Sequence, residues 1–382
     1  MNRHTTMALF SCAVVGMVFL KIPPVLPRFQ DLYFLSSAQA AFLVTSVTIS
    51  HALVQIPAGM VTDRLGSRKA LICSLLLICV SSILPVAGPS PSLLIISGLL
   101  SGTGTGFAFN SGIKYATLHS SDRFRGLVQG SFGGAFSLGG IPAYLIVPVL
   151  FDFEPKLIFA ITSAVALIPA LGLIIWGKDV EYKSRVTLEG LKIVFYIPSV
   201  WMIGVLHAIF FGSFMTLATW FPAFAVSFAG VDSLNQAGAW GSLLLMGSGI
   251  ARITGGAFVN WISSERILWY ALLFQAISMA VLICSSVSFV TVISFGTALY
   301  MSSVTFGAIF NLCYNMVGES HAGTGFGLLN FIANIGSSIF PVIFGWLVDM
   351  TCEYTTSFFF MIGLCCVGGL CLFFLKKEEK RS

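Results

Sequence analysis

Two cations stand inside long apolar stretches of this sequence, where a charge needs a partner. Lys21 follows the run Val14–Leu20, and Arg252 lies within LLLMGSGIARITGG. All 15 acidic residues fall in the polar segments between such stretches or near the chain ends. An ionisable group in hydrocarbon is costly unless it is paired or faces water. An anionic ligand bound by both residues is therefore the simplest missing partner, and a planar guanidinium suits carboxylate, nitrate or phosphate groups.

Each cation also has a structural alternative. Pro23 and Pro24 loosen the chain just after Lys21, so its amine can extend to the nearer membrane surface. Arg252 lies about one helical turn from the end of its stretch, where a guanidinium can bond to loop carbonyls instead of a ligand.

Two histidines and a glutamine lie at similar depth in apolar stretches. His51 and Gln55 are one helical turn apart and share a helix face, and His207 occurs in HAIFFGSF. A histidine changes charge near neutral pH, so either ring can carry a coupled proton. The alternative is a neutral histidine that is hydrogen-bonded in the protein interior.

Asparagines supply further polar groups at this depth. Asn110 and Asn311 occupy equivalent places in a repeated pattern described below, and we expect their amides to contact a solute. Asn330 and Asn334 are one turn apart and are interpreted first as hydrogen-bonding groups between helices. The aromatic residues Phe210, Phe211 and Trp220 are candidates to shape a cavity, but the sequence does not distinguish among them.

Composition identifies the elements that carry these residues as membrane spans. Of 382 residues, 57% are hydrophobic and only 9% are charged, with a mean hydropathy of +0.93. Soluble domains carry about 25% charged residues, and a span needs about 20 apolar residues. Twelve spans are predicted: Thr6–Leu26, Ala40–Ala58, Ala70–Ala87, Ser92–Tyr115, Gly126–Leu150, Lys156–Trp176, Pro198–Ala218, Leu234–Val259, Ile267–Val287, Phe289–Cys313, Thr324–Val348 and Thr356–Leu375.

The spans divide into two halves of six. The most polar internal segment, with KDVEYKSR, separates an N-terminal bundle (1–177) from a C-terminal bundle (196–382) as a linker at 178–195. GFAFN ending at Asn110 matches GAIFN ending at Asn311, and Gln55 matches Arg252, with offsets of about 200 residues. Such parallel repeats predict two related bundles with a substrate path between them.

Basic residues indicate the orientation in the membrane. The N-terminus, the even-to-odd loops, the linker and the C-terminus hold 16 of the 20 lysines and arginines. The positive-inside rule places that side, and therefore both termini, in the cytoplasm. The expected location is the cell (inner) membrane, as a multi-pass protein.

A charged turn between the second and third spans carries a family resemblance. The segment Gly59–Lys69 reads GMVTDRLGSRK and resembles the loop G-x-x-x-D-R-x-G-x-R-[KR] of major facilitator superfamily transporters. SSAQAAFLVTSVTISHALVQIPAG resembles that family's second helix, and Asp122–Gly126 its loop between helices 4 and 5. The family's helix-4 arginine is replaced by Gly98, and only Gly140-Ile141-Pro142 stands where antiporters carry a Gly-Pro pair. Both departures disfavour a drug/proton antiporter.

The resemblance implies an all-α fold of twelve transmembrane helices in two pseudo-symmetric six-helix bundles. It also implies alternating access, in which the charged loops latch the cytoplasmic side. The residues expected to act in gating are Gly59, Asp63, Arg64, Gly66, Arg68, Lys69, Asp122 and Arg125. Arg252 resembles a helix-8 arginine of anion-carrying members.

The predicted function is secondary active transport of a small organic or inorganic acid anion, driven by a gradient of an ion or solute. Alternatives are an exporter of hydrophobic compounds and a non-transporting receptor with this fold.

An enzyme is not expected, because no catalytic or metal-binding arrangement occurs at membrane depth. No cofactor or nucleic acid is predicted. The glycine-rich Ser101–Phe109 lies inside an apolar span, where it predicts close helix packing. The expected partners are the anion, a coupled proton or counter-anion and the lipid bilayer, and the protein is expected to be a monomer.

Overall fold

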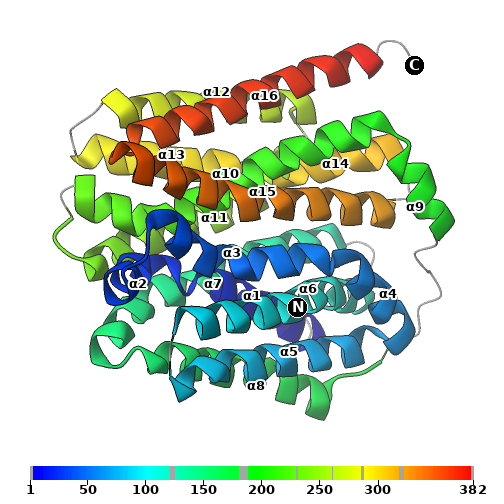
Figure 1. The fold of residues 1–382 in the computed structure, drawn as a ribbon. Helices are drawn as coiled ribbons and strands as arrows, with labels where there is room; N and C mark the ends of the chain where they lie inside the picture. The colour runs from blue at the N-terminus through cyan, green and yellow to red at the C-terminus, as the bar shows by residue number, and fades with distance from the viewer. Residues whose placement is uncertain are drawn as a thin grey trace.

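The protein is represented by a computed structural model that describes residues 3–88, 90–120, 125–179, 188–228, 231–259, 261–284, 288–317 and 322–379. These residues form sixteen α-helices and two short 3-10 helices, η1 and η2. Figure 1 shows the long helices lying roughly side by side, with α1–α8 in one group and α10–α16 in another.

The first half contains the helices up to Trp176. In chain order they are α1 (Arg3–Leu20), η1 (Pro23–Val25), α2 (Leu26–Tyr33), α3 (Ser37–Leu53), α4 (Gln55–Leu65), α5 (Ser67–Ile83), η2 (Leu84–Ala87), α6 (Pro91–Leu118), α7 (Arg125–Phe153) and α8 (Lys156–Trp176). The short helix α9 (Leu188–Phe195) follows and lies inside the predicted linker. The boundaries of that linker remain a prediction.

The second half repeats this succession of long helices. It consists of α10 (Pro198–Phe228), α11 (Leu234–Phe258), α12 (Ser264–Cys284), α13 (Ser288–Val304), α14 (Phe306–Val317), α15 (Ala322–Thr351) and α16 (Thr355–Glu379). The all-α fold of two bundles is as the sequence predicted.

Three predicted spans are broken rather than continuous. The first ends its α-helix at Leu20, because Pro23 and Pro24 cannot donate the backbone bonds that would continue it. The second bends by 50° between α3 and α4, around Val54. Pro57 lies in the first turn of α4 and leaves the carbonyl of Leu53 without its usual intrahelical donor. The tenth is interrupted at Thr305, between α13 and α14.

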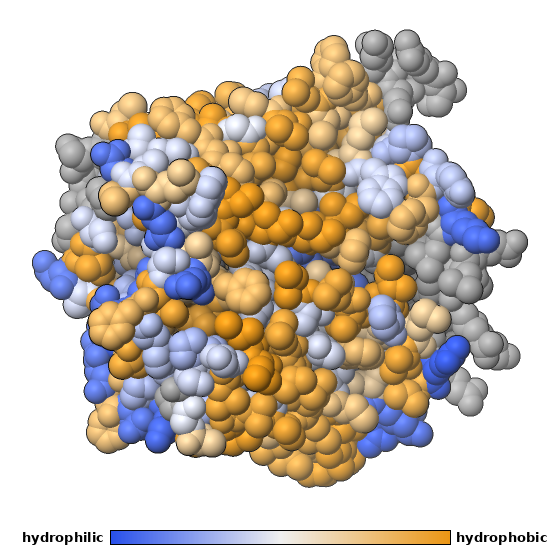
Figure 2. All heavy atoms as spheres, viewed as in Figure 1, coloured by the Kyte–Doolittle hydropathy of each residue, from blue (hydrophilic) through white to orange (hydrophobic). Residues whose placement is uncertain are grey.

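Ten helices among the described residues are long and apolar enough to cross a membrane, and the bent pair α3 and α4 makes eleven. The remaining predicted span corresponds to α11, a 25-residue helix whose sequence is rich in glycine and serine and contains Arg252. Figure 2 shows hydrophobic side chains across the middle of one face, with hydrophilic ones toward two opposite edges. This distribution matches a surface that crosses a bilayer.

Close approaches between helices occur at glycines, as the Ser101–Phe109 run predicted. A Cβ on Gly102 would collide with the carbonyl of Val47, and one on Gly104 would press on Ile78. These glycines therefore pack α6 against α3 and α5. Between the halves, α7 packs along α11 and α3 packs along α15.

Candidate functional site

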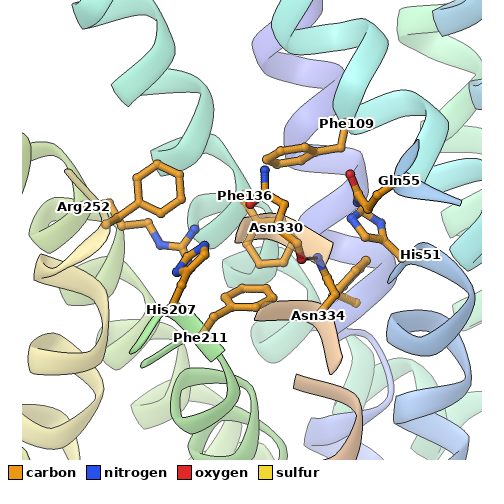
Figure 3. Close-up of a pocket in the computed structure, with 11 residues that line it drawn as sticks. His51, Gln55, Phe109, Phe136, His207, Phe211, Arg252, Asn330 and Asn334 are labelled. Atoms are coloured by element: carbon orange, nitrogen blue, oxygen red, sulfur yellow. Dashed lines mark hydrogen bonds between the residues drawn. The ribbon is translucent and has the colours of Figure 1, made fainter. Parts of the chain in front are cut away.

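A cavity lies between the two halves, and both contribute side chains to it. It has about 400 Å³ of empty volume, including the part open to solvent. Figure 3 shows Arg252 and His207 toward one side of it and Gln55 and His51 toward the other. Its lining consists of Phe19, His51, Gln55, Phe109, Phe136, His207, Phe211, Arg252, Phe306, Asn330 and Asn334.

Arg252 is the permanently charged residue of this lining. It extends from α11 and only 6% of its surface is exposed. Its guanidinium carbon lies 4.9 Å from the ring centre of Phe214 and 5.4 Å from those of Phe136 and Phe306. Nη1 donates to the carbonyl of Gly133 at 3.5 Å, while Nε has no partner among the described residues. Aromatic faces and one carbonyl stabilise the cation partially, and its charge is left for a ligand to neutralise.

Gln55 begins α4, directly after the break at Val54, and is 4% exposed. Asn110 on α6 donates its amide hydrogens to the backbone carbonyl of Gln55 at 3.1 Å and to Gln55 Oε1 at 3.0 Å. Asn110 is outside the cavity lining. In this conformation Asn110 holds Gln55 by hydrogen bonds, and its expected contact with a solute stays a prediction.

The two histidines line the cavity from opposite halves. His51 Nδ1 lies 3.0 Å from Thr105 Oγ1, and the ring makes an edge contact with Phe19 at 5.0 Å. His207 packs against the rings of Phe306 and Phe310, and its Nδ1 has no partner among the described residues. Of the predicted aromatic candidates, Phe211 lines the cavity, whereas Phe210 and Trp220 are core residues.

The sequence interpretation did not assign Asn330 and Asn334 to the site. Both line the cavity from α15, and Asn334 donates to the backbone carbonyl of Asn330 at 2.8 Å. Their spacing of one helical turn at membrane depth was the available signal, and it equals that of His51 and Gln55. The spacing does not reveal which helix face meets the other half.

Two predicted ligands lie elsewhere. Lys21 is buried, with 3% of its surface exposed, but its amine lies 5.3 Å from the ring centre of Phe159 on α8, inside the first half. It is not part of the cavity lining, so the structure does not bring Lys21 and Arg252 together. Asn311 donates to Ser264 Oγ at 3.0 Å and is likewise outside the lining, because it faces α12.

The comparisons with known proteins agree with this architecture. Residues 7–341 match the model of the Major Facilitator Superfamily. The chain belongs to this superfamily. It is 23% identical to the probable sulfoacetate transporter SauU of Cupriavidus necator, over 91% of this chain and 87% of SauU. It is 25% identical to the probable nitrate/nitrite transporter NarK2 of Mycobacterium tuberculosis, over 87% of this chain and 86% of NarK2.

A solved structure confirms the major facilitator fold. A bacterial homologue of the human lysosomal transporter Spinster, in an inward-facing and occupied conformation, superimposes with a TM-score of 0.79. The match covers 99% of this chain and 98% of the homologue at 14% identity. Because the chain belongs to this superfamily and its relatives are named as transporters, the protein is a membrane transporter and not an enzyme.

The superfamily loop Gly59–Lys69 shows how its charges are used in this conformation. Gly66 ends α4 with a φ of +83°, which favours glycine. Arg68 donates to the carbonyls of Leu173 and Ile174 at 3.0 Å each and pairs with Asp179 at 3.3 Å. Arg68 therefore binds the carboxyl end of α8, where free carbonyls and the helix dipole favour a cation.

Other predicted gating residues make less contact. A Cβ on Gly59 would meet no atom within 4 Å, so Gly59 makes no close helix contact in this conformation. Arg64 and Lys69 are exposed. Asp122 and the side chains of Asp63 and Arg125 lie outside the described residues, so their gating role stays a prediction.

Polar contacts join the halves at the end that carries α2. Asp349 on α15 accepts hydrogen bonds from the backbone N–H groups of Ser37 (2.8 Å) and Ala38 (2.9 Å), at the start of α3. A carboxylate at a helix N-terminus is stabilised by the free N–H groups and the helix dipole. Nearby, Asn235 of α11 donates to Asp152 of α7 at 3.3 Å.

Proposed function

We propose that this superfamily member is a secondary active transporter of a small organic or inorganic acid anion. The observation that carries the proposal is Arg252, which is buried between the halves, lines the cavity and has no carboxylate partner among the described residues. A buried cation without a counter-charge is strongly destabilising, so an anionic solute is the natural complement. The names of the relatives, which specify sulfoacetate and nitrate or nitrite, support this substrate class.

The transport mechanism in this proposal is alternating access, with the halves rocking around the cavity. The contacts of Asp349 and Asp152 hold the α2 end closed, and the positive-inside pattern assigns that end to the outside, with both termini in the cytoplasm of an inner-membrane protein. The loop Gly59–Lys69 serves as the opposite latch.

A distance measurement tests this role of Asp349. Spin labels at Phe34 and Met350, which are exposed and come from opposite halves, report on the α2 end. Asp349→Asn removes the charge that accepts from α3, so the label distances should shift to longer values. Unchanged distances would mean that Asp349 does not hold this end closed.

Energy comes from a gradient, by co-transport of a proton or exchange with a counter-anion. His51 and His207 are the candidate proton carriers, since both line the cavity and an imidazole can take up and release a proton. The protein is proposed to act as a monomer, because each chain contains both halves and the whole cavity.

Flux measurements test the proposed function. Purified protein in proteoliposomes should take up labelled small anions, and Arg252→Gln should abolish that uptake. Five phenylalanines in the lining favour one rival, an exporter of hydrophobic compounds. Dye efflux from cells without anion flux in proteoliposomes would establish the exporter instead. The absence of flux for either class would leave the receptor alternative.

A further inference from the structure

The cavity contains polar atoms whose hydrogen bonds are not made within the protein. Four such buried atoms belong to lining residues: Arg252 Nε, Gln55 Nε2, His207 Nδ1 and Asn334 Oδ1 have no partner among the described residues. All four side chains are at least nine-tenths buried. Leaving a buried polar group unpaired costs about 1–3 kcal/mol, so these atoms describe what a bound solute should offer.

The orientation of Gln55 is determined by its neighbour. The Asn110 side-chain atom that faces Gln55 also faces the backbone carbonyls of Gln55 and Gly106, at 3.1 and 3.4 Å. Carbonyl oxygens only accept, so this atom must be the Asn110 nitrogen. The Gln55 atom that receives its hydrogen bond, at 3.0 Å, must then be the oxygen. The remaining amide nitrogen of Gln55 is therefore a donor available to the cavity.

The orientation of the Asn334 amide follows from the same reasoning, but here the unpaired atom is an acceptor and not a donor. One atom of its amide lies 2.8 Å from the backbone carbonyl of Asn330 and must be the nitrogen. The other atom, Oδ1, is therefore an acceptor, and it is unpaired among the described residues. Ser338 does not satisfy it, because its hydroxyl lies 2.7 Å from the backbone carbonyl of Asn334 and 2.9 Å from Thr48 Oγ1, which are the acceptors for its single proton.

We propose that the site selects a small monoanion that carries a hydrogen-bond donor of its own, as in hydroxy acid anions with a carboxylate or sulfonate head. The inference rests on the proposed anion transport and narrows its substrate class. The head group binds Arg252, Gln55 Nε2 donates to an oxygen, and the hydroxyl of the solute donates to Asn334 Oδ1. The single permanent charge of the lining disfavours a dianion, since the second charge would be buried without a partner.

An ion that only accepts hydrogen bonds fits this arrangement poorly. Nitrate or a simple carboxylate satisfies Arg252 and Gln55 but leaves Asn334 Oδ1 unpaired. Such an ion also places one of its own oxygens close to Asn334 Oδ1, where the two oxygens repel each other. Selection by a buried group that requires a hydroxyl is stronger than selection by size, because the analogue without the hydroxyl leaves the group unsatisfied.

Pairs of probes that differ by one hydroxyl test the inference. Lactate and isobutyrate share a carboxylate and exchange a hydroxyl for a methyl group, as do 2-hydroxyethanesulfonate and propane-1-sulfonate with a sulfonate head. Calorimetric titration of the purified full chain should show at least roughly tenfold tighter binding of the hydroxyl member in one or both pairs. The pair that binds identifies the head group, and nitrate should bind as weakly as the methyl analogues.

Substitution of Asn334 tests whether this residue causes the preference for a hydroxyl. Asn334→Ala should remove most of the hydroxyl preference, so that the ratio of the two affinities falls toward one. Asn315→Ala, at an exposed position on α14, should keep the wild-type ratio. Retention of the full preference in Asn334→Ala would overturn the assignment to Asn334.

The wild-type comparison is decisive even if that variant does not fold. The inference would be overturned if the methyl members, or nitrate, bound as tightly as the hydroxyl members. The proposed anion transport would remain intact. If no anion binds, and Arg252→Gln behaves as the wild type does, both the inference and the proposed function fail.

Discussion

Arg252 and Lys21 are both buried cations in apolar segments, yet the structure gives them different surroundings. Arg252 lies in the cavity between the halves, near four phenylalanine rings and a carbonyl of the opposite half. Lys21 lies within the first half, next to the ring of Phe159, and its amine has no hydrogen-bond partner among the described residues. The same signal in the sequence therefore marks a cavity in one case and a bundle interior in the other.

The difference arises from the direction in which each helix presents its side chain. Lys21 stands where α1 ends before Pro23, and its side chain turns toward α8. Arg252 stands inside α11, whose neighbour α7 belongs to the other half. Depth in the membrane predicts that a charge is costly, whereas only packing decides whether a solute can reach it.

The strongest test of this comparison is removal of the guanidinium. Arg252→Gln should lower the affinity for the transported anion by tenfold or more, because a lost charged hydrogen bond costs about 1.5–3 kcal/mol. Arg252→Lys should recover only part of the affinity, since lysine keeps the charge and loses the planar fork. Calorimetric titration in detergent measures both effects.

Arg266→Gln is the matched control, because Arg266 is an exposed arginine of the same half. It should bind the anion as the wild type does. Wild-type affinity in Arg252→Gln would mean that the buried guanidinium is structural, and the exporter alternative would then be favoured.

Much of the fold was predictable from sequence because hydrophobic length and repeats encode it directly. The twelve segments, the two halves and the equivalence of Gln55 with Arg252 all followed from spacing, and both residues line the cavity. Helix breaks were less predictable. Pro57 signals the bend at Val54, but the interruption at Thr305 has no proline to announce it.

The site was predicted only in part, because residue spacing defines a helix face without saying what that face contacts. His51 and Gln55 have the same one-turn spacing as Asn330 and Asn334, and all four line the cavity. The asparagine pair was nevertheless assigned to contacts between helices. Lys21 was assigned to the site because it is a charge inside the first apolar span.

A second test exchanges the ring that accompanies each cation. Phe214 is nearest to Arg252 and is outside the cavity lining, so it acts on a solute only through the guanidinium. Phe214→Leu should lower anion affinity at least about two- to fivefold, since a cation–π contact contributes about 0.5–1 kcal/mol even at exposed sites. Phe159→Leu, at an equally buried ring, should leave affinity unchanged. Equal losses in the two variants would mean that general core loosening, and not the position of Arg252, sets the affinity.

The smallest expected effect on binding is that of Lys21→Met, which removes the amine and keeps an unbranched side chain of similar length. An amine buried without an acceptor is destabilising whether or not it holds its extra proton. The variant should therefore unfold at a higher temperature in detergent than the wild type, with anion affinity within about a factor of two, a difference of about 0.4 kcal/mol. Lys192→Met, at an exposed position on α9, should change neither quantity.

A tenfold loss of affinity in Lys21→Met, without loss of folded protein, would show that Lys21 reaches the anion in another conformation of the transport cycle. The two cations would then act at one site, and the contrast between them would apply only to the conformation described.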